Sequence, residues 1–462
     1  MPTTRTPQTS PRTPQTAHRT PQTAHRTPHT ATKGAFKNKG LRKIFSFLLS
    51  SFLLFSLSPF PGAAQPLTLS ECYEKTEKNY PLIHQLELID QSEKYNLQNV
   101  SRAWIPQVQL YGKASLQTDA PNFSMPPPLD ISVDVPKDQY QIYLQLNQII
   151  WDGGQIRSAK KTVQAATQVQ RKQNEVDIYT IRGRVNDLFF GIILYDSQIE
   201  QIKVNLQELQ RNLDKVTSFV ELGFANESDI DAVKVEQLSA EQTIIQLATM
   251  REAFVAMLGA FMGEELSPDI TLQKPEVIMV QESNNRLELQ LFDISVEAQK
   301  IQNAQILAKN MPKIGFFMQG GFARPGLNMF DVDGKLYAVG GVQLNWGFGN
   351  LYTLKNEKRI IENNINTIEI NRKLFLLNQS LQTKQQRAIA EQYRKILASD
   401  DEIIRMRENI YRASAAKTEH GTLSVTDLMR DLNMQHAVKA QKIVHEVQHL
   451  KALYDLRNLY NN

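Results

Sequence analysis

The sequence has 462 residues, of which 41% are hydrophobic and 22% charged, so it holds enough apolar material for a folded core. Its formal net charge of +4 is misleading, because residues 1–64 contain nine of the 52 Lys and Arg residues and none of the 48 acidic ones. The remainder carries 43 basic and 48 acidic residues, a net charge of −5, which excludes the basic surface that nucleic-acid binding requires. The single cysteine, Cys72, excludes an intramolecular disulfide, and Glu71 before it disfavours lipidation, which needs a small residue there.

Residues 1–36 are the most biased segment of the chain. A seven-residue unit close to Arg-Thr-Pro-Gln-Thr-Ala-His recurs between residues 5 and 32, with at least one proline in each unit. This proline density forbids a helix, and almost no apolar side chain is available to bury, so we predict a disordered segment. It resembles an over-extended gene start more than a working, translated part of the protein.

Residues 37–64 have the three parts of a secretory signal peptide. Four basic residues lie within Lys37–Lys43, an apolar run covers residues 44–57, and small residues precede a cleavage site near Ala64. The run is shorter than the roughly 20 residues of a membrane-spanning helix, so export is favoured over an anchor. Because no other stretch reaches spanning length, we expect no transmembrane helix in the mature chain.

The exported part begins with a helix and a strand. Residues 67–104 have a helical pattern with Ser70 as the expected N-cap, and Ile105-Pro106 ends the helix. Residues 107–117 then alternate between apolar and polar side chains, as in a strand with one apolar face. A proline-rich loop at 119–136 follows.

A second alternating strand, over residues 140–147, leads to Trp151-Asp152-Gly153-Gly154 and a very long helix. The helical pattern from Gln155 covers about 68 residues, on the order of 100 Å, which no compact domain needs. Its apolar residues recur at alternating steps of three and four, the 3.5-residue seam of a coiled coil. The seam consists of Ile178, Ile181, Val185, Leu188, Ile192, Tyr195, Ile199, Ile202, Leu206, Leu209, Leu213, Val216 and Val220.

The same order of elements then occurs a second time. After Gly223 a helix returns over residues 228–262, and a break at 263–275 precedes the second copy. That copy comprises a helix at 285–309, strands at 313–322 and 337–345, a long helix at 350–420, Gly421, and a last helix at 427–460. We therefore divide the exported chain into two structural repeats, residues 65–276 and 277–462.

The four strands are each about as long as a tilted membrane-spanning strand, and each has a single apolar face. Four strands cannot close into a barrel, and an open sheet edge is not tolerated in lipid. If the strands face a bilayer, several chains must share one barrel. The strand pattern alone fits a small soluble sheet equally well, and it is the export signal and the long helix that favour the membrane.

The order of these features resembles a TolC-type outer-membrane efflux protein across residues 65–462. The segment Gly421-Thr422-Leu423-Ser424-Val425-Thr426-Asp427-Leu428 is similar to the second helical tip of that family. The resemblance implies a mainly α fold with a membrane β part. In such proteins a homotrimer builds a 12-stranded barrel in outer-membrane lipid, continued by a coiled-coil tunnel through the periplasm. The family's partners are a periplasmic adaptor protein and an inner-membrane pump, proton-driven or ATP-driven.

The resemblance also assigns roles to the two turns between long helices. Gly223, Phe224, Ser228 and Asp229 match the first adaptor-docking tip, and Gly421, Thr422, Leu423 and Asp427 match the second. Asp427 also matches the first of two acidic positions that ring the periplasmic entrance in this family. Arg430 occupies the second position, with Asp431 beside it, so the departure leaves a double acidic ring in doubt. A helix cap or first-turn acid is the alternative role of Asp427, and it is the favoured role of Asp229 and Asp231 at the first tip.

One enzymatic pattern competes with this interpretation. His445, Glu446 and His449 fit the zinc-protease motif H-E-x-x-H, and two histidines one turn apart can share a metal. A third ligand is missing, because Asp455 would point about 120° away from the histidines on a continuous helix. A chance occurrence on a polar helix face is favoured.

The sequence therefore predicts a channel rather than an enzyme, with no cofactor and no bound metal. It would passively conduct exported substrates (drugs, metals or proteins) from the adaptor and pump to the exterior. The alternatives are a soluble or exported coiled-coil rod and, more remotely, a zinc metallopeptidase.

Overall fold

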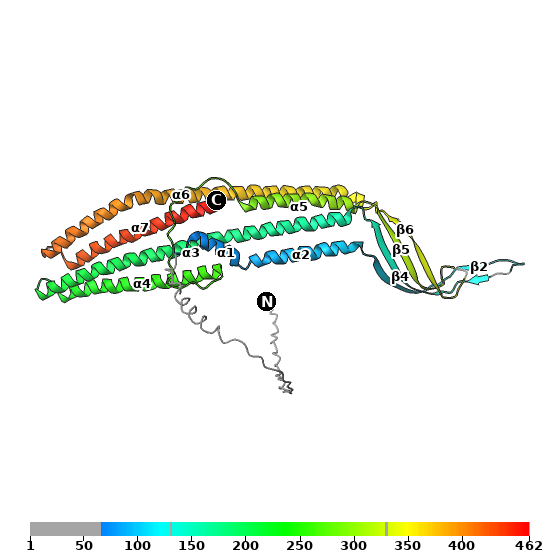
Figure 1. The fold of residues 1–462 in the computed structure, drawn as a ribbon, viewed down its shortest axis with the longest axis horizontal. Helices are drawn as coiled ribbons and strands as arrows, with labels where there is room; N and C mark the ends of the chain where they lie inside the picture. Colours follow the sequence, from blue (N-terminus) through cyan, green and yellow to red (C-terminus); the bar gives the residue numbers. More distant parts are fainter. Residues whose placement is uncertain (1–65, 130–131, 329–330, 462) are drawn as a thin grey trace, which may run out of the picture. The chain divides into compact units, whose positions relative to one another are not determined.

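The computed structural model describes residues 66–461, except 130–131 and 329–330. The expectations of a disordered segment over 1–36 and a signal peptide over 37–64 lie outside the described residues. Within them, the chain is built from seven α-helices, a short 3-10 helix and six strands, arranged as Figure 1 shows.

The first predicted helix is two helices. Helix α1 (Leu69–Asn79) begins after Thr68, whose hydroxyl accepts a hydrogen bond from the Glu71 amide, and α2 covers Ile83–Ser101. The prediction of one helix with Ser70 as its N-cap was wrong on both counts. Pro81 lacks an N–H and forces the preceding residue into an extended conformation, so the helix has to stop there. The 3-10 turn η1 (Arg102–Trp104) then leads into the sheet.

The four long strands form one antiparallel sheet in the order β1-β4-β5-β6. Their bounds are Gln107–Leu116 for β1, Asp138–Trp151 for β4, Lys313–Arg324 for β5 and Lys335–Asn345 for β6. All four lie where the alternating pattern predicts them. The proline-rich loop contains a separate small hairpin that the pattern missed, β2 (Asn122–Ser124) with β3 (Ser132–Asp134).

Helix α3 (Gln155–Glu221) is the long helix of the first repeat, with 67 residues. It begins where Asp152 accepts hydrogen bonds from the amides of Gly154 (2.9 Å) and Ile156 (2.5 Å), so the Trp-Asp-Gly-Gly segment acts as a helix start. None of the seam side chains from Ile178 to Val220 is exposed, which confirms the coiled-coil face.

The second repeat has the same order of elements as the first. Helices α2, α3 and α4 (Glu227–Met262) correspond in order to α5 (Leu287–Lys309), α6 (Asn350–Glu419) and α7 (Val425–Tyr460), with two sheet strands after the first helix of each set. Helix α6 has 70 residues, so both repeats contain one long helix. The boundary at residue 276 falls between α4 and α5 and stays a prediction.

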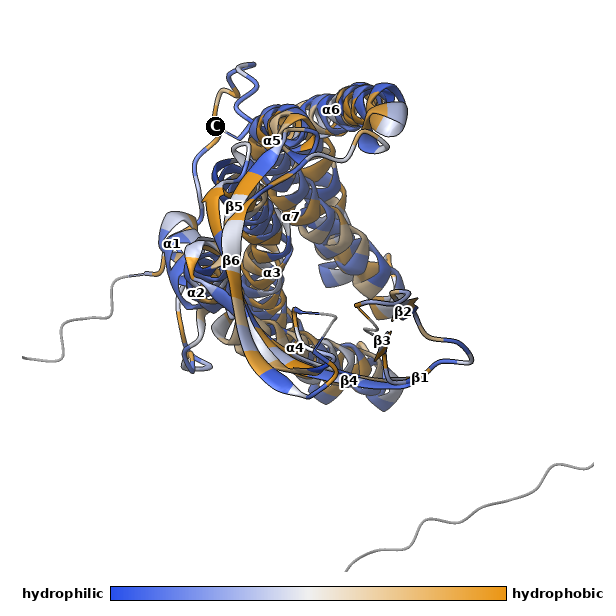
Figure 2. Cartoon of the chain, turned by 90° about the vertical axis from the view of Figure 1, so that its right-hand side faces the viewer, coloured by the Kyte–Doolittle hydropathy of each residue, from blue (hydrophilic) through white to orange (hydrophobic). Residues whose placement is uncertain are grey.

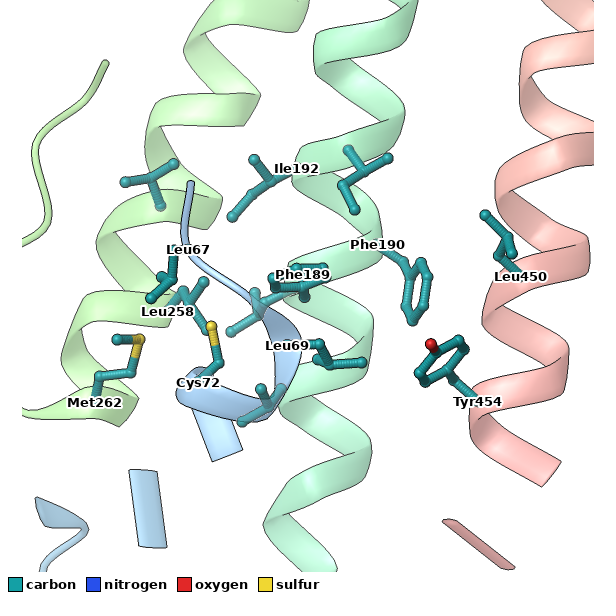
Figure 3. Close-up of a cluster of buried hydrophobic side chains, with 14 of the residues drawn as sticks. Leu67, Leu69, Cys72, Phe189, Phe190, Ile192, Leu258, Met262, Leu450 and Tyr454 are labelled. Carbon is teal, nitrogen blue, oxygen red and sulfur yellow. The ribbon is translucent and has the colours of Figure 1, made fainter. Parts of the chain in front are cut away.

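Two buried clusters hold the helices together. The larger one joins α1, α3, α4 and α7, and Figure 3 shows Phe189 and Phe190 of α3 at its centre. Cys72 lies fully buried in this cluster, and burial raises the pKa of its thiol to about 12. The smaller cluster, which we call the tip cluster, lies toward the ends of the hairpins and joins α3, α4 and α7. Its buried members are Leu209, Val216, Val233, Val425, Leu428, Met429 and Leu432.

Helix α4 differs from the sequence expectation in one respect. It is long and apolar enough to cross a membrane, and it is the one helix of the described residues with that length and composition. The premise that no other stretch reaches spanning length was therefore wrong, and the expectation of no transmembrane helix stays a prediction. Helix α4 nevertheless packs along α3: Val255, Leu258 and Met262 are buried, and a Cβ on Gly191 of α3 would lie 2.5 Å from the Phe254 ring.

Candidate functional site

The sheet has two chemically different faces. Neighbouring strands are in register, so that Leu110 lies beside Leu144 and Met318 beside Leu146. Even-numbered residues of the four strands therefore point to the same face, up to the irregularity between Ile149 and Trp151 at the end of β4. Exposed apolar side chains on this face are Val108, Leu110, Leu116, Ile142, Leu144, Phe316, Met318, Leu336, Val342 and Leu344. So large an apolar surface on a folded chain marks a place that lipid or protein must cover.

The odd-numbered residues make the opposite face polar. The Gln319 amide donates to Gln145 Oε1 across 3.0 Å, and the Gln141 amide donates to the Tyr337 hydroxyl across 2.6 Å. Tyr111 and Tyr143 stack with ring centroids 5.1 Å apart. This face therefore suits water.

The sheet is open at both sides. Strands β1 and β6 each pair on one side, and among the described residues neither has a second neighbour. Figure 2 views the sheet end-on as a curved band, with apolar and polar residues alternating along β5 and β6. Two long unpaired edges are a template for pairing with further strands.

The two turns between long helices have the same backbone geometry. Gly223 and Gly421 both adopt left-handed conformations, with φ of +78° and +69°. In each turn the residue after the glycine donates to a carbonyl five residues earlier, Phe224 to Phe219 at 2.7 Å and Thr422 to Lys417 at 2.9 Å. This is the glycine-terminated helix end that satisfies otherwise free carbonyls.

At the first tip, the N-cap of α4 is Asn226, two residues before the predicted start. Its side chain and that of Asp229 form a capping box, and the Asn226 amide donates to Asp229 Oδ2 across 3.0 Å. Phe224 is 80% exposed, and Ser228 is also exposed. Asp229 is thus a capping residue, as favoured, while Phe224 supplies an apolar contact point.

At the second tip, Ser424 is the N-cap of α7 and Asp427 is its partner. The Asp427 amide donates to Ser424 Oγ (3.1 Å), and Ser424 Oγ donates back to Asp427 Oδ2 (2.7 Å). Asp427 Oδ1 also lies 3.1 Å from Arg430 Nη1. Asp431 accepts a hydrogen bond from Ser414 of α6 at 2.5 Å, so it fastens α7 to α6. Within one chain, each of these charged groups therefore has a structural partner.

The tip cluster brings both tips to the same end of the described part. Val216 of α3 and Val233 of α4 flank the first turn, and Val425 and Leu428 of α7 follow the second turn. Lys215 of α3 and Glu419 of α6 add an ion pair of 2.8 Å between the hairpins. The structure thus places the two predicted docking tips at the same end of the long helices (Figure 1). Leu423 is only half-buried there.

The H-E-x-x-H pattern does not converge on a metal. His445 Nδ1 lies 2.8 Å from Asp400 Oδ2, and His449 Nδ1 lies 3.1 Å from the Ala390 carbonyl, so both rings contact α6. Glu446 pairs with Lys274 at 3.0 Å. Across the described residues, no group of three His, Cys, Asp or Glu side chains is placed to hold a metal ion.

Comparison with solved structures reveals extensive likeness at low identity. The open state of the MtrE outer membrane channel of Neisseria gonorrhoeae is 11% identical with a TM-score of 0.61, covering 85% of this chain and 89% of that one. The CmeC outer membrane channel of Campylobacter jejuni is 10% identical with a TM-score of 0.58, covering 85% of each chain. VceC, an outer membrane protein of Vibrio cholerae, is 11% identical with a TM-score of 0.55, covering 83% and 95%. No protein-family model and no curated protein matches the sequence.

This is the TolC-type fold of outer-membrane channels. The sequence resemblance predicted that fold, with its duplicated strand and long-helix unit. The contacts that fasten α7 to α3 were not predicted. They include His436 with Glu208 and Lys451 with Asp187. No local pattern marks them, because each joins residues more than 200 positions apart.

Proposed function

We propose that this chain is one subunit of a trimeric outer-membrane channel that passively conducts exported substrates. The observation that carries the proposal is the sheet, which combines one exposed apolar face with two unpaired edges. A lone four-stranded sheet cannot span lipid, because its edge groups would lack hydrogen-bond partners. Pairing β6 of one copy with β1 of the next satisfies both edges, and three copies give twelve strands.

In the proposed barrel, the even-numbered residues face lipid and the odd-numbered residues line the pore. Glutamines 109, 141, 145 and 319 then surround a water-filled lumen. The long helices continue this lumen into the periplasm. The chain itself catalyses no reaction and binds no cofactor in this proposal, and the energy for transport comes from its partners.

The predicted signal peptide and the likeness to outer-membrane channels both support an outer-membrane location. We propose that a periplasmic adaptor docks on the two tips, and that an inner-membrane pump delivers drugs, metals or proteins through it. The position of both tips at the same end supports this role, and Phe224 offers an exposed apolar anchor at the first turn. Asp427, Arg430 and Asp431 near the second tip are the proposed entrance residues.

Adjacent residues of β1 provide a matched experiment. Leu110 is 68% exposed on the apolar face, and Gln109 precedes it on the polar face. We expect Leu110→Lys to impair membrane insertion, since a lysine facing the bilayer midplane costs about 2–4 kcal/mol. Gln109→Lys should still give a heat-labile trimer that is extracted only by detergent, with altered single-channel conductance in planar bilayers.

Two outcomes would contradict the proposal. The wild-type chain purifying without detergent as a monomer would favour the soluble-rod alternative. Equal tolerance of lysine at both positions would show that the even-numbered face does not contact lipid.

A further inference from the structure

Helix α7 is fastened to α3 at two distant places. Toward its C-terminal end, Lys451 lies 2.8 Å from Asp187 of α3 and 2.6 Å from Asp455 of α7 itself. Although burial favours the neutral amine, Asp455 and Asp187 raise the pKa of Lys451 above its ordinary value. This attachment therefore keeps its charge at any physiological pH.

The second attachment, nearer the tips, depends on a histidine. His436 Nε2 of α7 lies 3.2 Å from Glu208 Oε2 of α3, and only 8% of the histidine side chain is exposed. The ring is not aligned for a straight hydrogen bond, and Nδ1 has no hydrogen-bond partner within the described part of the chain. The contact thus rests on charge attraction rather than on hydrogen-bond geometry.

The surroundings of His436 contain more negative than positive groups. Glu208 of α3 is the nearest charge, and Glu236 of α4 lines the same groove of about 280 Å³. Lys439, one turn along α7, is paired with Glu408 of α6 at 2.9 Å. Charged groups of α3, α4, α6 and α7 therefore all lie around the imidazole.

Two neutral groups complete the environment of the pair. Tyr411 of α6 is bonded to Asn212 of α3, with its hydroxyl 3.1 Å from the Asn212 amide, and also reaches Glu208. Burial raises the pKa of Tyr411, so this phenol stays neutral near pH 7. Any pH response of the contact therefore comes from the imidazole and its carboxylate partner.

We propose that His436 and Glu208 form an acid-strengthened latch between α7 and α3 at the tip end of the helices. Imidazole is the side chain whose charge changes most readily in the physiological pH range, so the attraction is present when the ring is protonated and is lost when the ring is neutral. Proximity of the His436 ring lowers the pKa of Glu208, against the opposing effect of burial. A carboxyl group whose pKa is lowered on folding stabilises the contact only while it is ionised. The latch therefore also weakens in strong acid, where Glu208 becomes protonated.

The two attachments respond differently to pH. Deprotonation leaves a neutral, nearly buried imidazole facing an ionised carboxylate at the tip end, while the Lys451 attachment persists. The pair α6 and α7 can then separate from α3 at the tips and remain held near the C-terminus. If the chain forms the proposed channel, acid keeps its periplasmic entrance closed.

Hydrogen–deuterium exchange on the purified full-length oligomer tests the latch at pH 5.5 and pH 7.5. Rates are corrected for the intrinsic pH dependence of exchange and referenced to residues 178–193 of α3. For wild type we expect peptides within residues 425–440 to open about five- to tenfold more at pH 7.5, the size expected for a partly exposed charged contact. His436→Gln and Glu208→Gln should abolish this difference.

Two further variants make the test decisive. His445→Gln removes a histidine–carboxylate pair that joins α7 to α6 alone, and it should leave the pH response of residues 425–440 intact. His436→Lys supplies a permanent cation and should hold the protected state at both pH values, which covers the case where the glutamine variant fails to assemble. A flat wild-type response, or a response that survives in His436→Gln, would overturn the latch. Exchange needs no transport, so conductance of the same oligomer tests the proposed channel separately.

Discussion

Replacing Leu432 with alanine tests whether the tip cluster joins the two helical hairpins. Leu432 of α7 is fully buried, and the cluster around it includes Leu209 and Val216 of α3 and Val233 of α4. If the cluster couples the hairpins, a cavity at Leu432 loosens both tips, including the first tip to which this residue does not belong.

The expected cost follows from the side-chain volume removed. The substitution deletes three carbon groups, about 0.8 kcal/mol each in transfer free energy. A fully buried leucine leaves a cavity as well, so the total is about 2.7–5 kcal/mol. Because about 1.36 kcal/mol is a factor of ten, local opening of the tips should rise at least about a hundredfold.

Limited trypsin digestion of the purified oligomer measures this opening. Lys417 and Arg430 lie at the second tip and Lys215 lies near the first, and all three are exposed but stand within helices. Cleavage at these sites requires local unfolding, so its rate follows the open population. Leu222→Ala is the matched control, because Leu222 is 67% exposed at the first tip. An increase below about fivefold, or one equal to that of the control, would refute the coupling.

Three further predictions concern the two tips and the Lys451 attachment between α7 and α3. Gly421→Glu should leave trimers intact, because a Cβ there meets no atom within 4 Å and the left-handed backbone costs a non-glycine residue only about 1–2 kcal/mol. The same variant should abolish adaptor-dependent efflux, and normal efflux would rule out the docking role. Asp427→Ala frees Arg430 and should reduce cation block or change conductance in planar bilayers, and unchanged single-channel records would count against an entrance role. Lys451→Met leaves the mostly buried Asp455 without its cation and should lower the free energy of unfolding by about 1–3 kcal/mol. The measurement is the inactivation temperature, which should fall, and Lys451→Arg is the control.

Most of the fold was predictable because its helices and strands follow local periodicities of the apolar residues. The 3.5-residue seam located α3, and period-two alternation located all four long strands to within a few residues. The glycine turns were equally visible, since Gly223 and Gly421 each follow a long helical pattern and precede another. Duplication strengthened every one of these predictions, because each element occurred twice in the same order.

The failures have separate physical causes. Pro81 was a visible helix breaker, but the apolar pattern continues on both sides of it and concealed the division into α1 and α2. The hydropathy of α4 was underestimated, because its apolar residues are spread around the helix rather than gathered on one face. Contacts such as His436–Glu208 were beyond prediction, since they depend on how two helices from different repeats are aligned along each other.

The distribution of polar contacts indicates which parts of the tip end move together. Within the α6–α7 pair, Ser414–Asp431, Glu408–Lys439, Asp401–Lys442 and Asp400–His445 occur at successive positions along the helices. Between this pair and α3, fewer such links occur at the tip end, namely His436–Glu208, Asn212–Tyr411 and the exposed Lys215–Glu419. Exposed ion pairs contribute little, so the boundary between α3 and the α6–α7 pair is the weaker one. When the tips open, α6 and α7 should therefore move as a unit, and Asp427 and Arg430 should move with them. The pair stays intact during this motion, so the charge at the entrance changes because the pair moves and not because its two members separate.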